Sequence, residues 1–127
     1  MKKDSVFLLL AAIGLTPIAL AYGLIPAATV PLLYGVEVDS ISLIHILRAV
    51  MGLYLAMVVF WVLGATREYL RFAALCSVVV FMGGLALGRL ASVLIDGVPA
   101  PLLVVYLLLE VGFALVAFQF ARGQRGN

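Results

Sequence analysis

Four long apolar stretches fill most of this chain, and they constrain its fold more than any other feature. They cover about residues 5–24, 42–64, 72–95 and 101–121. A helix of about 20 residues is about 30 Å long, which matches the hydrocarbon core of a bilayer. Since 66% of the 127 residues are apolar and only 11% are charged, a soluble domain is excluded. We therefore expect one integral membrane domain over residues 1–127.

Short connections predict how these stretches are arranged. Residues 64–71 and 96–100 are the connections between the last three stretches, and connections this short place consecutive helices side by side and antiparallel. Asp39 or Ser40 can cap the second helix, and Pro101 favours the first turn of the fourth. The expected fold class is an all-α membrane protein, an antiparallel up-down four-helix transmembrane bundle.

The segment from about residue 25 to residue 40 is open to two interpretations. It contains Pro26, Pro31 and Gly35, so it is too short and too interrupted for another crossing. It is either an outer flap on the membrane surface, with Tyr22 and Tyr34 in the interfacial layer, or a plain connector. The preceding stretch follows Lys2 and Lys3 and could be confused with a secretory signal, but we expect it to be a membrane span.

Positive charge flanks the stretches on one side only, which predicts their orientation. By the positive-inside rule, that side is cytoplasmic and carries both termini. This arrangement makes the basic residues membrane anchors, so we expect no nucleic acid partner. The basic residues are Lys2, Lys3, Arg67, Arg71, Arg122 and Arg125, whereas Glu37, Asp39 and Asp96 lie on the other side.

Three charged residues, Arg48, Arg89 and Glu110, lie inside apolar stretches. All are about 9 to 14 Å from the outer ends of their helices. An ion that faces lipid costs several kcal/mol at least, so we expect these side chains to turn inward and meet. One carboxylate for two guanidinium groups leaves about one positive charge, which predicts an anion site.

Further polar residues lie near these charges in the predicted helices. His45 is one turn from Arg48, and Asp96 is two turns from Arg89, so both would shape an outward entrance. Tyr106 is one turn from Glu110 and could hydrogen-bond within the same site, whereas we interpret Tyr54 as apolar filling. The predicted ligand-binding residues are Arg48, Arg89, Glu110, Asp96, His45 and Tyr106.

Small residues recur at three- or four-residue spacing, in two of the stretches below a charged residue, and they predict close helix contacts, either within the bundle or between copies of the chain. The repeats are Gly84, Gly88 and Ser92 in the third stretch, Arg48, Gly52 and Ala56 in the second, and Glu110, Ala114, Ala117 and Ala121 in the fourth.

The chain lacks the residues of common catalytic and metal sites. It has one histidine and one cysteine, Cys76, which are too few for a disulfide or a zinc or iron site. It also has no phosphate loop, no cofactor fingerprint and no nucleophile beside a base. We expect no catalytic residues, no metal and no cofactor, and we favour a protein that is not an enzyme.

Part of the sequence resembles a known family. The motifs are Arg48-Ala49-Val50-Met51-Gly52, Gly88-Arg89-Leu90, Asp96-Gly97-Val98-Pro99 and Glu110. Over about residues 45–115 they look like a small bacterial membrane family, domain of unknown function 4345. The resemblance implies a four-span bundle in a bacterial inner membrane, with Arg48, Arg89, Asp96 and Glu110 at the family's polar positions. It implies no activity.

Three functions remain open. The preferred one is a nonenzymatic membrane module whose outward-facing pocket binds an anionic lipid headgroup, a small acidic ligand or a partner protein. The second is a small oligomeric proton-coupled transporter that uses Glu110. An intramembrane isomerase-type enzyme with His45, Asp96 or Glu110 in proton transfer ranks last. The expected partners are membrane lipids, an anionic ligand, and further copies of the chain or another membrane protein. The buried charges could also serve only to lock helices together.

Overall fold

The described part of the protein is entirely helical in its regular structure. The computed structural model describes residues 2–125, the side chain of Arg125 excepted. Four of its helices are long and apolar enough to cross a membrane, and only the short second helix is not. α4 begins a turn earlier than the sequence suggested, and α5 ends a turn later. The elements are α1 (Lys3–Gly23), α2 (Pro26–Tyr34), α3 (Ile41–Thr66), α4 (Glu68–Asp96) and α5 (Pro101–Arg125).

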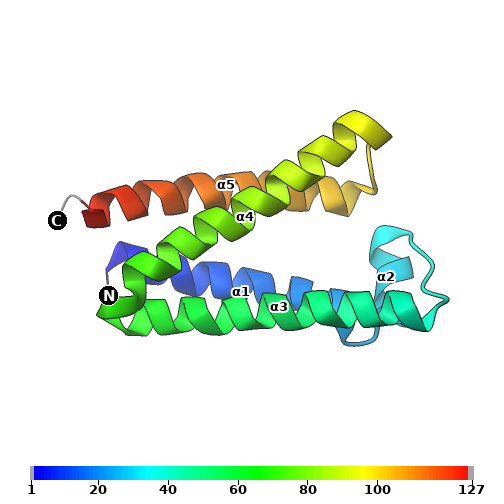
Figure 1. Ribbon diagram of the computed structural model, residues 1–127, viewed down its shortest axis with the longest axis horizontal. Helices are drawn as coiled ribbons and strands as arrows, with labels where there is room; N and C mark the ends of the chain where they lie inside the picture. The colour runs from blue at the N-terminus through cyan, green and yellow to red at the C-terminus, as the bar shows by residue number, and fades with distance from the viewer. Residues whose placement is uncertain (1, 126–127) are drawn as a thin grey trace.

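The long helices form two pairs. α1 packs along α3, and α4 packs along α5, with consecutive long helices running in opposite directions (Figure 1). The pairs are joined where α3 passes into α4, and they diverge towards the opposite end, where α2 lies. The start of α1 and the end of α5 lie at the same end of the structure as the α3–α4 junction, and α2 and the α4–α5 connection lie at the other end.

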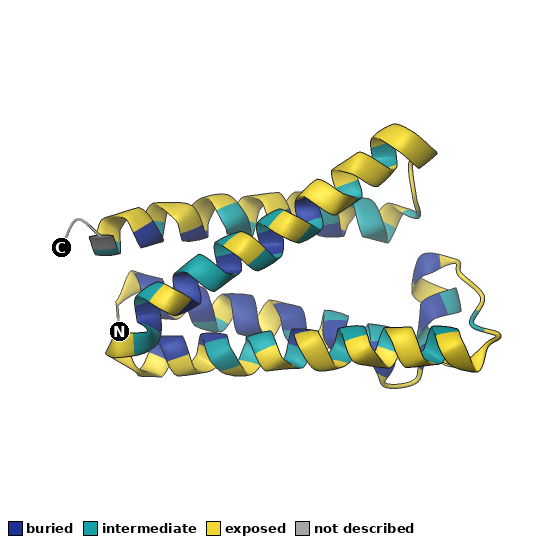
Figure 2. Ribbon diagram, in the orientation of Figure 1, coloured by how far each residue is buried: buried dark blue, intermediate teal, exposed yellow. Residues whose placement is uncertain are grey.

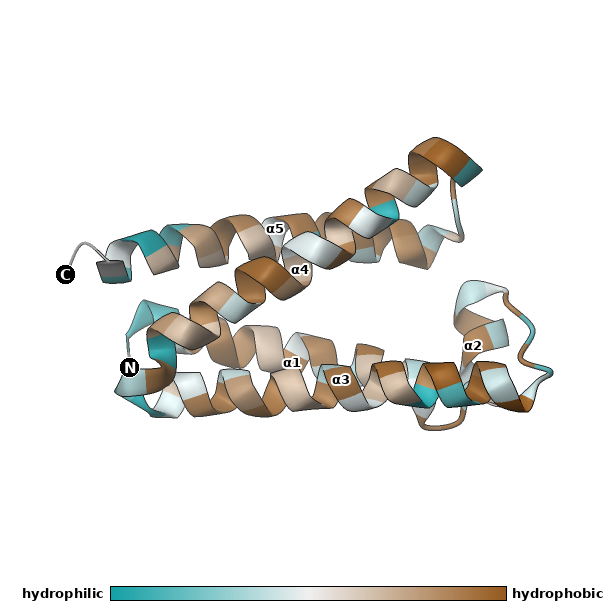
Figure 3. Ribbon diagram, viewed as in Figure 1, coloured by the Kyte–Doolittle hydropathy of each residue, from teal (hydrophilic) through white to brown (hydrophobic). Residues whose placement is uncertain are grey.

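Small side chains let the pairs pack closely. The buried face of α1 carries Ala11, Ala12 and Ala19, which contribute to the same core as Trp61 of α3 and Ala117 of α5. Buried faces of the helices are turned towards one another, and exposed faces point outward (Figure 2). Much of the outward surface is nonetheless apolar (Figure 3). An apolar exterior around a close-packed interior is the arrangement that suits contact with lipid chains.

Two glycines are required by close helix contacts. A Cβ atom on Gly23 would lie 2.4 Å from Cβ of Met51, and one on Gly64 would lie 2.2 Å from Cβ of Ala74. In contrast, no atom lies within 4 Å of a Cβ on Gly52, Gly84 or Gly88. Within residues 2–125, these three glycines are therefore not required by a close helix contact, whereas Ala117 and Ala121 of α5 are buried.

The α3–α4 junction is held by a buried arginine. Arg71 donates hydrogen bonds to the carbonyl oxygens of Gly64, at 3.3 Å, and Ala65, at 3.0 Å. These carbonyls lie in the last turn of α3, where helical partners are missing. Arg71 therefore has a structural contact in addition to its place among the flanking basic residues. The other end of α3 is capped as the sequence suggested, since Ser40 Oγ accepts from the amide of Leu43 at 3.1 Å.

The segment between the first two long helices contains a helix that the sequence did not indicate. α2 begins at Pro26, whose fixed backbone suits a first turn, and ends before Gly35, which adopts a φ of 70°. Val30 and Tyr34 are buried against Tyr106 and partly buried neighbours. α2 contacts α1, α3 and α5, so it is a packed element of the fold.

Candidate functional site

An ion pair between α4 and α5 forms the centre of the site. Arg89 Nε donates to Glu110 Oε1 at 2.6 Å. The Glu110 side chain is 8% exposed and that of Arg89 is 21% exposed. The short connection from α4 to α5 brings the two residues to the same level, because each lies two to three turns from it. The carboxylate and the guanidinium thus compensate each other's charge away from water.

Tyrosines from four helices surround the guanidinium group. Arg89 Nη2 donates to the hydroxyl of Tyr22 at 3.2 Å, and its guanidinium carbon lies 5.7 Å from the ring centre of Tyr106. The ring of Tyr22 stacks on Tyr34 at 5.1 Å and meets the edge of Tyr54 at 5.7 Å. We call Tyr22, Tyr34, Tyr54 and Tyr106 the tyrosine cluster. Ring faces attract the cation, and the hydroxyl fixes its orientation.

The hydroxyls of Tyr34 and Tyr106 lie 2.9 Å apart and form a buried hydrogen bond. Burial, together with this bond, raises the pKa of the Tyr34 hydroxyl above its usual range, so Tyr34 is neutral. One hydroxyl donates to the other, and the accepting hydroxyl keeps its own hydrogen for a further partner. The bond also fastens α2 to α5.

Removing one hydroxyl of this pair is expected to cost about 1 kcal/mol, because the remaining one loses its buried partner. Tyr34→Phe and Tyr106→Phe should each have this effect, and the double variant should lose clearly less than the sum. Unfolding of the four proteins in mixed detergent, followed by circular dichroism, measures the difference. Strictly additive losses would show that the two hydroxyls do not interact.

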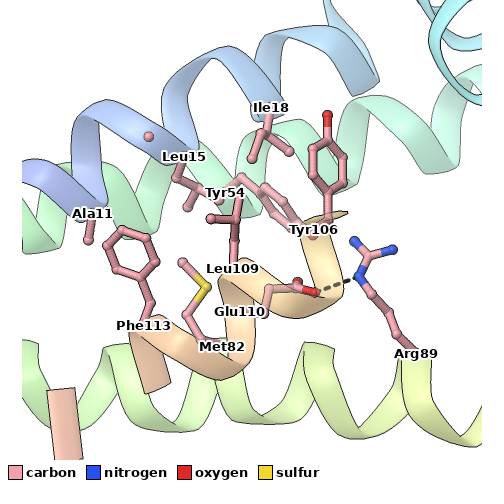
Figure 4. A pocket seen from close by; sticks show the side chains of 11 residues that line it. Ala11, Leu15, Ile18, Tyr54, Met82, Arg89, Tyr106, Leu109, Glu110 and Phe113 are labelled. Atoms are coloured by element: carbon pink, nitrogen blue, oxygen red, sulfur yellow. Dashed lines mark hydrogen bonds and ion pairs between the residues drawn. The ribbon is translucent and has the colours of Figure 1, made fainter. Parts of the chain in front are cut away.

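Arg89 borders an internal cavity between α1, α3, α4 and α5. The volume of this cavity is about 60 Å³, measured as the space open to the centre of a water-sized sphere. Most of its lining is apolar, with Leu15, Ile18, Met82 and Phe113 among the contributors. Arg89, Glu110 and Tyr106 lie together in the lining (Figure 4). The cavity therefore combines a hydrocarbon-like wall with one polar end.

Arg89 also borders a second, more open hollow between α3 and α4, which we call the α3/α4 groove. Its lining is formed by Val50, Leu53, Tyr54, Phe81, Gly84, Leu85, Gly88, Arg89 and Ser92. Tyr54 and Arg89 line both the groove and the internal cavity. These two side chains therefore form the boundary between the two spaces.

The remaining sequence-predicted residues lie outside this centre. Arg48 and His45 are exposed on α3, and no hydrogen bond or ion pair joins Arg48 to Glu110 in the described part of the chain. Leu47 and Met51 of α3 approach Gly23 of α1. Because a helix turns about 100° per residue, Arg48 lies to one side of these two residues, where it is exposed. The expected meeting of all three deep charges is thus limited to Arg89 and Glu110, and their pair carries no surplus positive charge.

Asp96 lies apart from the ion pair, whereas the tyrosines lie around it. Asp96 is exposed at the end of α4, where it accepts a hydrogen bond from Ser92 Oγ at 3.1 Å. Tyr106 lies close to Arg89, and Tyr54 is buried in the apolar core, in agreement with its interpretation as filling. The interfacial layer predicted for Tyr22 and Tyr34 did not indicate that their rings stack beside Arg89. No spacing rule connects residues on four helices, so only their residue type could have indicated the cluster. Among residues 2–125, no group of three or more potential metal-binding His, Cys, Asp or Glu side chains occurs.

The fold defines an all-helical protein with four helices that could cross a membrane. Its site is an interior ion pair that is surrounded by tyrosines. A family model described as Domain of unknown function (DUF4345) matches residues 4–121. The chain therefore belongs to this family, and the match extends the sequence resemblance into α1 and towards the end of α5. No curated protein and no solved structure matches the chain significantly.

Proposed function

We propose that this protein is a nonenzymatic multi-pass membrane module that binds an amphiphilic ligand through an acidic headgroup. In this proposal the four long helices cross a bacterial inner membrane as an antiparallel up-down bundle with both termini in the cytoplasm. α2 and the tyrosine cluster then lie towards the outer side. The one-sided distribution of flanking basic residues supports this orientation.

The observation that carries the proposal is the incomplete use of the Arg89 donors. Among the described residues, Nε donates to Glu110 and one hydrogen of Nη2 to Tyr22, whereas a guanidinium has five N–H groups in all. The remaining donors belong to a side chain that borders both hollows. A carboxylate or phosphate can accept two of them in a planar fork.

Glu110 and Tyr22 would then be positioning residues for Arg89. They hold the guanidinium in one orientation and leave its Nη edge for the ligand. Because Glu110 is itself negative, the headgroup would approach from the side away from Nε. The apolar part of the ligand would lie in an adjacent hollow, where it contacts other hydrocarbon groups.

A paired substitution tests headgroup binding without leaving an unpaired interior charge. Arg89→Gln together with Glu110→Gln keeps hydrogen-bonding side chains of similar length but removes both charges. We expect this variant to stay folded. Its affinity for anionic lipid should fall at least about tenfold below that of the original protein, which corresponds to about 1.4 kcal/mol of binding free energy. Native mass spectrometry of the purified protein measures the lipid that remains bound.

Arg48→Gln is the matched control, since it removes an arginine that is exposed on α3. Its bound lipid should equal that of the original protein. Equal lipid in the paired variant would contradict the proposal, and a loss of lipid only in Arg48→Gln would place the anion site on α3 instead.

A further inference from the structure

We propose that the α3/α4 groove holds an acyl chain of an anionic phospholipid from the surrounding membrane, with its phosphate at Arg89. This inference rests on the proposed function and names both the ligand and its route to the site. The ligand would enter sideways from the bilayer, between α3 and α4.

The lining of the groove suits a hydrocarbon chain. Leu53 and Val50 contribute from α3, and Phe81 contributes from α4. Gly84 and Gly88 leave the α4 side open, because nothing lies within 4 Å of a Cβ built at either position. In lipid, helix contacts depend on packing, so an open strip between two helices has to be filled by chains or by protein.

The position of Arg89 along α4 suits a lipid phosphate. α4 has 29 residues and is therefore about 43 Å long, whereas the hydrocarbon core of a bilayer is about 30 Å thick. Arg89 lies seven residues before Asp96, which is about 10 Å from the helix end. The excess length of α4 places this level near the boundary between acyl chains and headgroups.

The charge that faces the groove is positive and favours an anionic headgroup. Arg89 is the one charged residue in the lining of the groove, whereas its partner Glu110 lines the internal cavity instead. The nearby hydroxyl of Ser92 already donates to Asp96 at 3.1 Å, so the guanidinium supplies the hydrogen bonds. Asp96 is about 10 Å further out and exposed to solvent, where its repulsion is screened.

The test narrows the groove without touching Arg89. Gly88→Leu and Gly84→Leu place a side chain in the open strip, and leucine also favours the helix more than glycine does. Gly52→Leu is the matched control, because Gly52 likewise has open space around it but is absent from the lining of the groove. Full-length protein in detergent is titrated with phosphatidylglycerol or phosphatidylcholine, and bound lipid is counted by native mass spectrometry.

We expect Gly88→Leu to bind phosphatidylglycerol at least about tenfold more weakly than the original protein, and Gly84→Leu to bind it more weakly as well. Gly52→Leu should bind it normally, and phosphatidylcholine should bind weakly to all four proteins. If Gly88→Leu bound phosphatidylglycerol normally and the paired glutamine variant did not, the groove would not be the binding site of the acyl chain. The proposed function would still stand. Normal phosphatidylglycerol binding by both Gly88→Leu and the paired glutamine variant would overturn the inference about the groove and the proposed function alike.

Two further outcomes would also overturn the inference. Equal binding of phosphatidylglycerol and phosphatidylcholine by the original protein would show that headgroup charge does not select the lipid. A dimer that Gly88→Leu converts to a monomer, with lipid binding unchanged, would assign the groove to a second copy of the chain.

Discussion

Replacing Arg89 by leucine is expected to destabilise the folded protein by about 3–5 kcal/mol, the usual cost of removing one partner from a buried ion pair. Glu110 is 6% exposed, and Arg89 is its hydrogen-bond partner in the structure. Without Arg89, the carboxylate is left in an apolar interior without a donor. Unfolding in mixed detergent, followed by circular dichroism, measures the loss of free energy.

Replacing both residues should be far less damaging than replacing one. Arg89→Leu combined with Glu110→Leu removes both charges, and apolar pairs of similar volume are often as stable as the ion pair they replace. We expect the double variant to recover most of the stability that Arg89→Leu loses, but not lipid binding. If the single variant proved as stable as the double one, the carboxylate would have to reach water or another donor after the substitution.

The number and approximate bounds of the long helices could be predicted from the sequence, because they follow from the length and the low polarity of each apolar stretch. Local chemistry was also visible, as with the Ser40 cap of α3. The meeting of Arg89 and Glu110 follows from the short 96–100 connection, which fixes α4 and α5 side by side. Residues at similar distances from such a connection come to similar depths.

The rotation of each helix about its axis could not be predicted. In a soluble protein the apolar face indicates the core, but in a membrane protein both the interior and the lipid-facing side are apolar. The sequence therefore did not indicate that Arg48 faces outward. The close approach of Gly23 and Met51 fixes the rotation of α3 about its axis. The position of Tyr34 in the site could not be predicted either, because Tyr34 reaches the site only when α2 folds and packs.

A methyl group added at Gly64 is expected to destabilise the α3–α4 junction by about 3 kcal/mol, at the upper end of overpacking effects. The added Cβ would lie 2.2 Å from Cβ of Ala74, which is too close for any rotamer change to relieve. The helices themselves would have to separate, and the Arg71 hydrogen bonds to Gly64 and Ala65 would be disturbed. Thermal unfolding of Gly64→Ala in detergent measures the effect.

The same clash predicts a compensating substitution. Ala74→Gly removes the methyl group that Gly64→Ala would meet, so the exchanged pair should recover most of the lost stability, less about 1 kcal/mol for a glycine placed inside α4. Gly52→Ala serves as the control, because an added Cβ there meets nothing within 4 Å; it should be neutral or stabilise the helix by up to about 1 kcal/mol. A stable Gly64→Ala, or an exchanged pair no better than Gly64→Ala alone, would show that α3 and α4 are further apart at this junction than the Gly64–Ala74 contact requires.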